Sequence, residues 1–490
     1  MKLEKVLENI NYELLQGSLD IDINDIKYDS REVVNGDLFV CLTGYYSDGH
    51  DYIETAIEKG ATALLVERDV NVPDRITVIK VENSRKVLNK ASKNFFRNPD
   101  EELIKIGITG TKGKTTTTYM IKSILEKAGN KVGMMGTVGI YIGKEKYKTV
   151  NTTPESYVVY KYMRKMIDEG CKYVVMEVSS LGLKHGRVDN IMFDYGVFTN
   201  LSLDHVSPDS GREHPTYEDY ANSKKLLFNM CKVGIFNKDN DEYKRMVADA
   251  TCEIITFGKK DADVIINSIT KTSRVDKIHT SFELTGRVNG TFDLNLPGEF
   301  NVYNATVATI VTKLIGIEDK YIEEGLLSTV VDGRCQLFNV GNKFNVMIDF
   351  AHNLVSIESI INTMREYNPN RIITIFGVGG GKGEAQRKNM GKLVGELSDM
   401  AIITTDNPRL DDINVINSQI ESGVKETNCE YRIISDRKEA INYALSNAKE
   451  NDIILIVGKG HEKYQDIQGV KYPFSEEDII KEFIDNYGNK

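Results

Sequence analysis

A strand-like run that turns through a glycine-lysine loop into a helix-like run is the feature that most constrains the fold. Residues 103–110 (LIKIGITG) are mainly apolar, and residues 115–129 (TTTTYMIKSILEKAG) carry apolar side chains at helical spacing. The seven residues 110–116 between them read GTKGKTT. This order is typical of an α/β sheet, and the backbone N–H groups at such a helix start can hold phosphate.

The loop is a variant of the usual Walker spacing, because Ile108 stands where that pattern has its first glycine. Lys114 is placed to neutralise charge on the β- and γ-phosphates, and Thr115 to offer its hydroxyl to Mg²⁺. The alternative is a surface Gly-Lys turn, which the flanking strand and helix disfavour. We expect ATP and Mg²⁺ as cofactors, with the phosphates held by Gly110, Thr111, Lys112, Gly113, Lys114, Thr115 and Thr116.

Strand-like and helix-like runs alternate over the rest of the chain, as in parallel sheets covered on both faces. The 490 residues suffice for about three domains of ~150 residues each. We predict an α/β fold of three domains: residues 1–101, a central P-loop ATPase domain with a parallel sheet over residues 102–333, and a Rossmann-like domain over residues 334–490.

The composition excludes some functions. Hydrophobic residues make up 41% and charged residues 27% of the chain, which is typical of globular proteins. The net charge of -10 disfavours a general binder of nucleic acid or membrane surfaces. The six cysteines lack metal-ligand spacing and no apolar run reaches ~18 residues. We therefore expect a cytoplasmic protein with free thiols that does not bind nucleic acid or insert into membranes.

Motifs along the whole chain resemble those of the Mur ligase family. After the phosphate loop they are, in order, NTTPES, MEVSSLGLKHGRV, FTNLSLDH, YANSKKLLF, GRCQLF, DFAHN, DNPR and GKGHE. The earlier run YDSREVVNGDLFVCLTG is similar to the UDP-binding domain of members that extend UDP-N-acetylmuramoyl-L-alanyl-D-glutamate. The resemblance implies an ATP-dependent, amide-forming ligase of peptidoglycan synthesis that works through an acyl phosphate. The implied partners are the UDP-muramoyl-dipeptide and a diamino acid, and we expect a monomer.

The resemblance also implies a catalytic centre. Glu177 and His205 match the family's metal-binding residues, and Lys224 matches a lysine that the family carbamylates with CO₂. A carbamate is an oxygen ligand suited to Mg²⁺, and its formation requires the neutral amine. Without the resemblance, Glu177 and Lys224 would more often be solvated residues. The implied metal ligands are thus Thr115, Glu177, His205 and Lys224. Besides these, the resemblance implies that Lys114, Asp349 and His352 are catalytic. It also implies that the nucleotide is bound by Asn301, Asn304 and Arg334.

Two further groups match substrate-binding positions. For the sugar-peptide they are Ser30, Thr152, Thr153, Ser179, His185 and Arg187, with His185 standing where the family has glutamine. Taken singly, a serine or threonine here is more often a turn or cap residue. For the amino-acid acceptor they are Arg387, Asp406, Asn407, Pro408, Arg409, Gly458 and Glu462.

The DNPR form of the acceptor motif accompanies meso-diaminopimelate in the family. Arg409 could form two parallel hydrogen bonds with the distal carboxylate in a desolvated pocket, and Glu462 could face the distal ammonium. The alternative reading of DNP is an ordinary turn after a strand.

Departures from the family pattern keep other functions open. Residues 379–387 read GGGKGEAQR in place of the family's GGDRDxGKR, and the segment 205–220 is longer than usual. A paralogue that uses L-lysine, another amino acid or a modified muropeptide is one alternative. A folylpolyglutamate or cyanophycin synthetase and a non-catalytic ATP-binding scaffold are the others.

Overall fold

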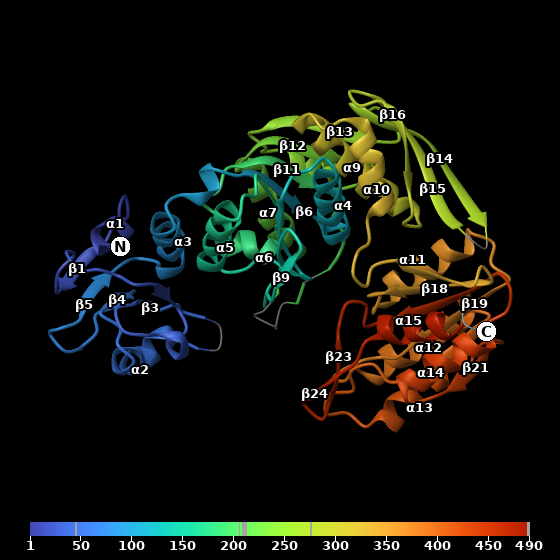
Figure 1. Ribbon diagram of the computed structural model, residues 1–490. Coiled ribbons are helices and arrows are strands. Elements are labelled where there is room, and N and C mark those ends of the chain that lie inside the picture. The colour runs from blue at the N-terminus through green and yellow to red at the C-terminus, as the bar shows by residue number, and fades with distance from the viewer. Residues whose placement is uncertain (45–46, 205, 208–212, 275–276, 488–490) are drawn as a thin grey trace. The chain divides into compact units, whose positions relative to one another are not determined.

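The structure is a computed structural model that describes residues 1–44, 47–204, 206–207, 213–274 and 277–487. It contains three main β-sheets, which follow one another along the chain (Figure 1). Contacts divide the chain into two compact units, residues 1–265 with 307–321 and residues 266–306 with 322–490.

The first sheet lies in the N-terminal part. Its strands have the order β1-β5-β4-β3-β2, and all neighbours are parallel except β1 and β5. Alternate residues point to opposite faces, so Leu38 and Val40 join one apolar cluster and Phe39 joins another. The elements are α1 (Leu3–Val6), β1 (Glu13–Gln16), β2 (Ile26–Lys27), η1 (Ser30–Glu32), β3 (Leu38–Val40), η2 (Gly49–Tyr52), α2 (Ile53–Glu58), β4 (Ala63–Val66), β5 (Thr77–Lys80), α3 (Ser84–Phe95) and η3 (Pro99–Glu101).

The second sheet has the strand order β16-β15-β14-β13-β12-β11-β6-β10-β7-β8-β9. Its centre, from β13 to β7, is parallel, so the phosphate loop after β6 lies at the carboxyl edge, where α/β sheets bind ligands. The strands are β6 (Ile104–Thr109), β7 (Val132–Gly136), β8 (Gly139–Ile142), β9 (Glu145–Tyr147), β10 (Tyr173–Glu177), β11 (Phe193–Phe198), β12 (Cys231–Asn237), β13 (Glu253–Gly258), β14 (Val264–Arg274), β15 (Lys277–Gly286) and β16 (Gly290–Leu294).

The helices of this central region begin with α4, which follows the phosphate loop directly. Apolar residues of α5 and α7 pack with the strands in one core cluster, which includes Met163 and Tyr220. The helices are α4 (Lys114–Lys127), α5 (Ser156–Asp168), α6 (Ser180–Lys184), α7 (Tyr217–Lys225), η4 (Leu226–Asn229), α8 (Tyr243–Val247), α9 (Glu299–Ile315) and α10 (Asp319–Ser328).

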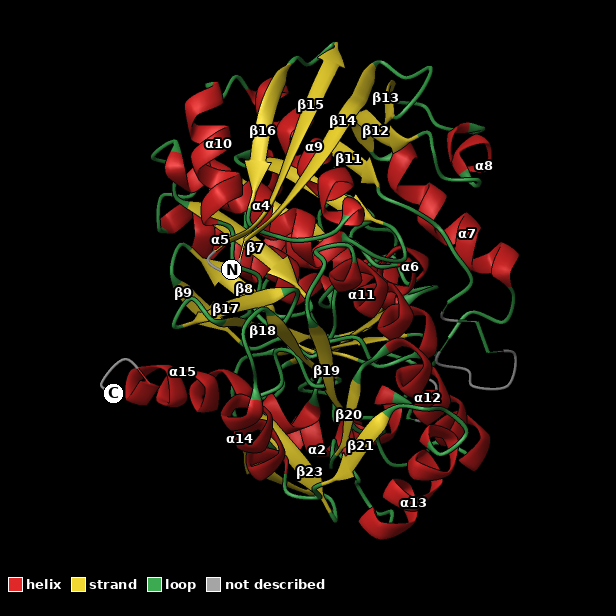
Figure 2. Cartoon of the chain, turned by 90° about the vertical axis from the view of Figure 1, so that its right-hand side faces the viewer, coloured by secondary structure: helices red, strands yellow, loops and turns green. Residues whose placement is uncertain are grey.

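The third sheet has the order β17-β18-β22-β19-β20-β21 and is parallel except for β17. Figure 2 shows α14 and α15 on one side of it and α12 and α13 on the other. The elements are β17 (Gln336–Val340), β18 (Phe344–Asp349), α11 (Leu354–Arg365), β19 (Arg371–Phe376), α12 (Glu384–Leu397), β20 (Met400–Ile403), α13 (Ile413–Val424), β21 (Glu430–Ile433), α14 (Arg437–Asn447), β22 (Asp452–Val457), β23 (Tyr464–Ile467), β24 (Val470–Pro473) and α15 (Glu476–Tyr487).

The predicted α/β class is confirmed, with one difference in strand direction. The expected strand over residues 103–110 is β6, and the expected helix over residues 115–129 is α4. The sheets are mixed instead of purely parallel, because short turns join β7 to β8 and β8 to β9, and such turns allow only antiparallel neighbours. No helix in the described part of the chain is long and apolar enough to span a membrane.

Candidate active site

The phosphate loop is a tight turn that leads into an uncapped helix. Gly110 has a φ of 149°, and a Cβ there would lie 1.9 Å from Thr199 Oγ1, so only glycine fits. Gly113 precedes α4 and supplies no side chain to cap its first N–H groups. Lys114 Nζ donates to the carbonyl oxygens of Gly110 at 2.8 Å and Thr111 at 3.1 Å. The loop therefore places Lys114 at the uncapped start of α4, where helix N–H groups and a lysine can together bind phosphate.

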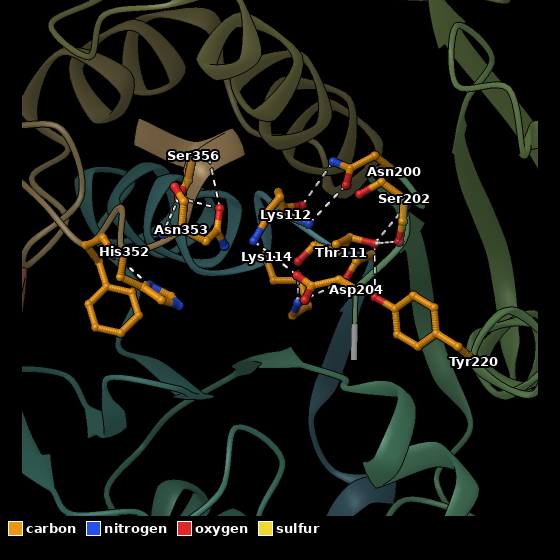
Figure 3. A network of polar contacts seen from close by, with 12 residues as sticks. Thr111, Lys112, Lys114, Asn200, Ser202, Asp204, Tyr220, His352, Asn353 and Ser356 are labelled. Atoms are coloured by element: carbon orange, nitrogen blue, oxygen red, sulfur yellow. Dashed lines mark hydrogen bonds and ion pairs between the residues drawn. The ribbon is translucent and has the colours of Figure 1, made fainter. Parts of the chain in front are cut away.

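Neighbouring loops hold the phosphate loop in place (Figure 3). The Lys112 backbone N–H donates to Asn200 Oδ1 at 2.9 Å, and Lys112 Nζ contacts Asp204 at 3.1 Å. Thr111 Oγ1 and the Tyr220 hydroxyl are hydrogen-bonded at 2.9 Å, which ties the loop to α7. The side chains of Thr111 and Lys112 thus attach the phosphate loop to neighbouring segments in this structure. Thr116 lies in the first turn of α4 and is half-buried.

Glu177 lies at the carboxyl end of β10, beside the phosphate loop. Its carboxylate is 2% exposed and accepts hydrogen bonds from Thr115 Oγ1 at 2.9 Å and from the Thr137 N–H at 2.9 Å. The structure thus brings together two of the four expected metal ligands as buried oxygen donors, a set that suits Mg²⁺. His205, the third, lies outside the described residues. Within the described ranges, no group of three or more His, Cys, Asp or Glu residues is arranged so that it could hold a metal ion.

Lys224 is buried next to the same loop. Its side chain is almost fully enclosed, and Nζ donates to the Gly110 carbonyl oxygen at 3.0 Å, the oxygen that Lys114 also contacts. Nζ also lies 4.6 Å from the centre of the Tyr220 ring. Burial lowers the pKa of Lys224 well below its ordinary value, and the charge of Lys114 lowers it further. The site therefore favours the neutral amine that carbamylation needs.

The residues expected to bind the sugar-peptide form a chain of contacts that starts at Glu177. Thr153 Oγ1 donates to the Glu177 carbonyl oxygen at 2.9 Å and accepts from the Ser179 N–H at 2.9 Å. Arg187 donates to the Thr153 carbonyl oxygen at 3.0 Å. Thr152 joins through its hydroxyl, 3.0 Å from that of Thr137. One glutamate thus links the phosphate loop through its side chain to this group through its backbone.

Glu155 was not predicted, although it directly follows the TTP motif. It bridges Arg187 and Arg85, each at 2.9 Å, and so joins the central region to α3 of the N-terminal part. Arg187 Nε is buried without a hydrogen-bond partner among the described residues, which leaves a donor for an anionic ligand. His185 lies in the same surroundings, since burial and the charges of Arg187 and Arg85 lower its pKa. Ser30 is buried in η1, and among the described residues no hydrogen bond joins its side chain to this group.

The expected nucleotide residues of the other unit also cluster. Asp349, at the end of β18, accepts from the N–H groups of Ala351 and Cys335, each at 2.8 Å, and so holds the segment that carries Arg334. The Arg334 guanidinium lies 4.5 Å from the centre of the Phe350 ring. His352 is exposed, and its Nδ1 donates to the Phe350 carbonyl oxygen at 2.9 Å.

Asn301 and Asn304 lie on the first turns of α9. Both are buried, and Asn304 Nδ2 donates to Asn301 Oδ1 at 3.1 Å. Asn301 also interacts with the thiol of Cys335, whose pKa is raised by burial and by the nearby Asp349 carboxylate. The five expected nucleotide-side residues of this unit therefore belong to one neighbourhood: Asn301, Asn304, Arg334, Asp349 and His352.

The expected acceptor residues meet at the carboxyl ends of β20 and β22. Asn407 Nδ2 donates to Glu462 Oε2 at 2.7 Å, and Gly458 approaches Asp406 so closely that a Cβ would lie 2.4 Å from its carboxylate. Lys459 was not predicted. It is fully buried, and its Nζ donates to Asn407 Oδ1 at 2.9 Å and Glu462 Oε2 at 3.2 Å.

The two arginines of the acceptor group have different surroundings. Arg387 is buried and donates to Asp411 at 2.5 Å and Gln419 at 2.9 Å. Arg409 has a φ of 53°, and its backbone pairs with Asp466 in β23, so a strained backbone directs its side chain. Its side chain is exposed in this structure, and the desolvated pocket stays a prediction. Pro408, just before it, is buried against the loop of Gly380.

The fold and this site define a phosphate-loop α/β enzyme. Three family models match in chain order: "Mur ligase family, catalytic domain" over residues 22–100, "Mur ligase middle domain" over 108–312 and "Mur ligase, glutamate ligase domain" over 333–460. The chain belongs to the Mur ligase family of ATP-dependent, amide-forming ligases.

Relatives match over the full length. UDP-N-acetylmuramoyl-L-alanyl-D-glutamate–2,6-diaminopimelate ligases of Caldanaerobacter subterraneus and Clostridium tetani are each 40% identical, over 99% of this chain and 99% of theirs. A solved structure of a ligase with the same name has a TM-score of 0.73 and 25% identity, with 100% of both chains covered. The MurF ligase of Thermotoga maritima in complex with ADP shares the fold, with a TM-score of 0.60 at 18% identity, over 95% of this chain and 98% of that one.

Proposed function

We propose that the chain adds meso-diaminopimelate to the D-glutamate side-chain carboxylate of UDP-N-acetylmuramoyl-L-alanyl-D-glutamate in peptidoglycan synthesis. The names of the full-length relatives support this substrate pair. We assign residues 1–101 to the UDP-muramoyl part, 102–333 to ATP and 334–490 to the amino acid. The cytoplasm, which supplies ATP, is the compartment that this reaction needs.

The reaction has two steps. A carboxylate oxygen of the substrate first bonds to the γ-phosphorus of ATP while the bond to the β-bridging oxygen breaks, which releases ADP and forms an acyl phosphate. The amine of the diamino acid then attacks the carbonyl carbon and loses a proton, and inorganic phosphate leaves. Both steps bring anions together and depend on positioning and positive charge.

The observation that carries the proposal is the double attachment of Glu177. Its carboxylate holds Thr115 of the phosphate loop, and its carbonyl oxygen holds Thr153 of the sugar-peptide group. A carboxylate substrate bound at the second group would therefore lie close to the γ-phosphate bound at the first. We assign Mg²⁺ to Thr115, Glu177, His205 and carbamylated Lys224, where it would offset phosphate charge.

The test is an assay with purified protein, UDP-muramoyl-dipeptide, ATP, Mg²⁺ and one amino acid at a time, read by product mass and ADP release. We expect the diaminopimelate adduct, and repeated turnover with ADP release only when both cosubstrates are present, because the acyl phosphate without an amine allows a single turnover at most. Repeated ADP release when one cosubstrate is missing would contradict a ligase. So would the absence of ADP release when both are present. A folate with glutamate, in place of the muropeptide, tests the folylpolyglutamate alternative.

Arg409 is the residue that we expect to bind the distal carboxylate of the acceptor. In Arg409→Lys we expect the KM for meso-diaminopimelate to rise, because an ammonium cannot form two parallel hydrogen bonds to a carboxylate. Since the guanidinium is exposed in this structure, we expect the lower end of the range for such a pair, about 2 kcal/mol or roughly 30-fold. The KM values for ATP and the muropeptide should stay within about twofold.

L-Lysine serves as the control acceptor, because it lacks the distal carboxylate. Wild-type protein should use it poorly, and Arg409→Lys should not change its KM. If wild-type protein uses L-lysine as well as meso-diaminopimelate, the assignment of Arg409 fails while the ligase assignment stands. The altered loop Gly381–Gln386 would then be the first segment to exchange for the family sequence.

A further inference from the structure

A buried ion pair contacts the two loops that carry the acceptor residues, one beginning at Asp406 and the other at Gly458. Arg437 begins α14 and Glu476 begins α15, and their side chains are 0% and 1% exposed. Arg437 Nε donates to Glu476 Oε1 at 2.7 Å. The pair lies 39 positions apart in the sequence. Isolated buried charges are costly, and the Arg437 guanidinium makes further hydrogen bonds besides the one to Glu476.

Those contacts lead to the two acceptor loops. Arg437 Nη2 donates to the Val457 carbonyl oxygen at 2.9 Å, and Nη1 donates to that of Thr405 at 3.4 Å. Val457 ends β22 immediately before Gly458, and Thr405 follows β20 immediately before Asp406. One guanidinium therefore joins the last carbonyl groups before both acceptor loops.

Glu476 lies near residues of the same two loops. Its second oxygen, Glu476 Oε2, is buried without a hydrogen-bond partner in the described part of the chain. Burial raises the pKa of Glu476, while the charges of Arg437 and Lys459 lower it and that of Asp406 raises it. Lys459 and Asp406 are thus close enough to interact with it electrostatically. The planar fork of arginine suits this arrangement, since it contacts three oxygens in fixed directions.

We propose that Arg437 and Glu476 are positioning residues that set the spacing of the two acceptor loops. This spacing lets Asn407, on one loop, form its hydrogen bond with Glu462 on the other. This inference rests on the proposed function, in which those loops bind the amino acid. Both side chains are buried, so we expect neither to touch the acceptor itself. A displacement of about 1 Å at a binding group can cost up to about 100-fold in rate.

The experiment must separate positioning from folding. Loss of Arg437 alone would leave a buried unpaired charge and destabilise the protein strongly. In the double variant Arg437→Met, Glu476→Met both charges are removed and the side-chain volume is largely kept, which is often neutral for stability. The matched control is Lys438→Met, Glu482→Met, which removes an exposed pair from the same two helices.

We expect the double variant to unfold at nearly the wild-type temperature. Its KM for the amino acid should rise about tenfold or more, with the KM values for ATP and the muropeptide within about twofold. Amide hydrogen exchange should be faster over residues 404–409 and 456–462, and the control should match wild type in both measurements. A wild-type KM for the amino acid or unchanged exchange would overturn the proposal. If wild-type protein accepts no amino acid, the proposed function has failed, and hydrogen exchange alone decides whether Arg437 and Glu476 set the spacing of the two loops.

Discussion

Lys114→Ala is expected to lower ATP-dependent amide formation by about 10³-fold or more while the fold is retained. Lys114 Nζ lies within the phosphate loop, where it contacts the carbonyl oxygens of Gly110 and Thr111. Transfer of a phosphoryl group to a carboxylate needs positive charge at this point, and alanine supplies none. Product formation and ADP release, both with saturating amino acid, measure the loss.

Lys127→Ala is the matched control, because Lys127 is exposed in the last turn of the same helix. It should keep wild-type turnover, and both variants should unfold within about 3 °C of wild type. Near-normal turnover in Lys114→Ala would show that the loop does not bind the reacting phosphates.

Lys224→Ala is expected to lose about 100-fold or more in turnover, with partial recovery when formate or acetate is added. The neutral amine that burial favours would react with CO₂ to give a carbamate, and alanine cannot form one. A small carboxylate in the vacated space could replace the carbamate oxygens as metal ligands. Lys225→Ala is the control, since Lys225 is partly exposed and pairs with the exposed Asp249.

Removal of CO₂ and bicarbonate gives an independent test of the same role. Wild-type turnover should fall in CO₂-depleted buffer and recover with bicarbonate, whereas acetate-rescued Lys224→Ala should be insensitive. If acetate has no effect and wild-type protein does not respond to bicarbonate, Lys224 acts as an ordinary buried lysine. Electron density at Lys224 in a substrate-bound crystal would then show an unmodified amine.

The local pattern of the sequence determined most of the secondary structure. The strand β6 and the helix α4 follow from their apolar periodicity, and the glycine-lysine turn between them predicts the phosphate loop. Strand direction at the sheet edges was not predictable in the same way. Whether a strand pairs parallel or antiparallel depends on its connection and its neighbours, as β8 and β17 illustrate.

The acceptor site shows the limits of a motif. DNPR and GKGHE predict its residues from the family pattern, but Lys459 and the buried Arg437–Glu476 pair were missed. A partner many positions away leaves no periodic signal. The motif also does not predict how exposed Arg409 is, because it specifies the residue and not the solvent around it.

Lys224 and Lys225 separate the two sources of information most clearly. They are adjacent, identical in covalent chemistry and both within one helix, so the residues themselves cannot rank them; only the resemblance to a family selected Lys224. The tertiary structure decides between them physically. Lys224 is enclosed beside Lys114 and Gly110, where burial lowers its pKa, and Lys225 is partly exposed in an ion pair with Asp249. The pKa of a side chain depends on what surrounds it in three dimensions, and those neighbours come from distant parts of the chain.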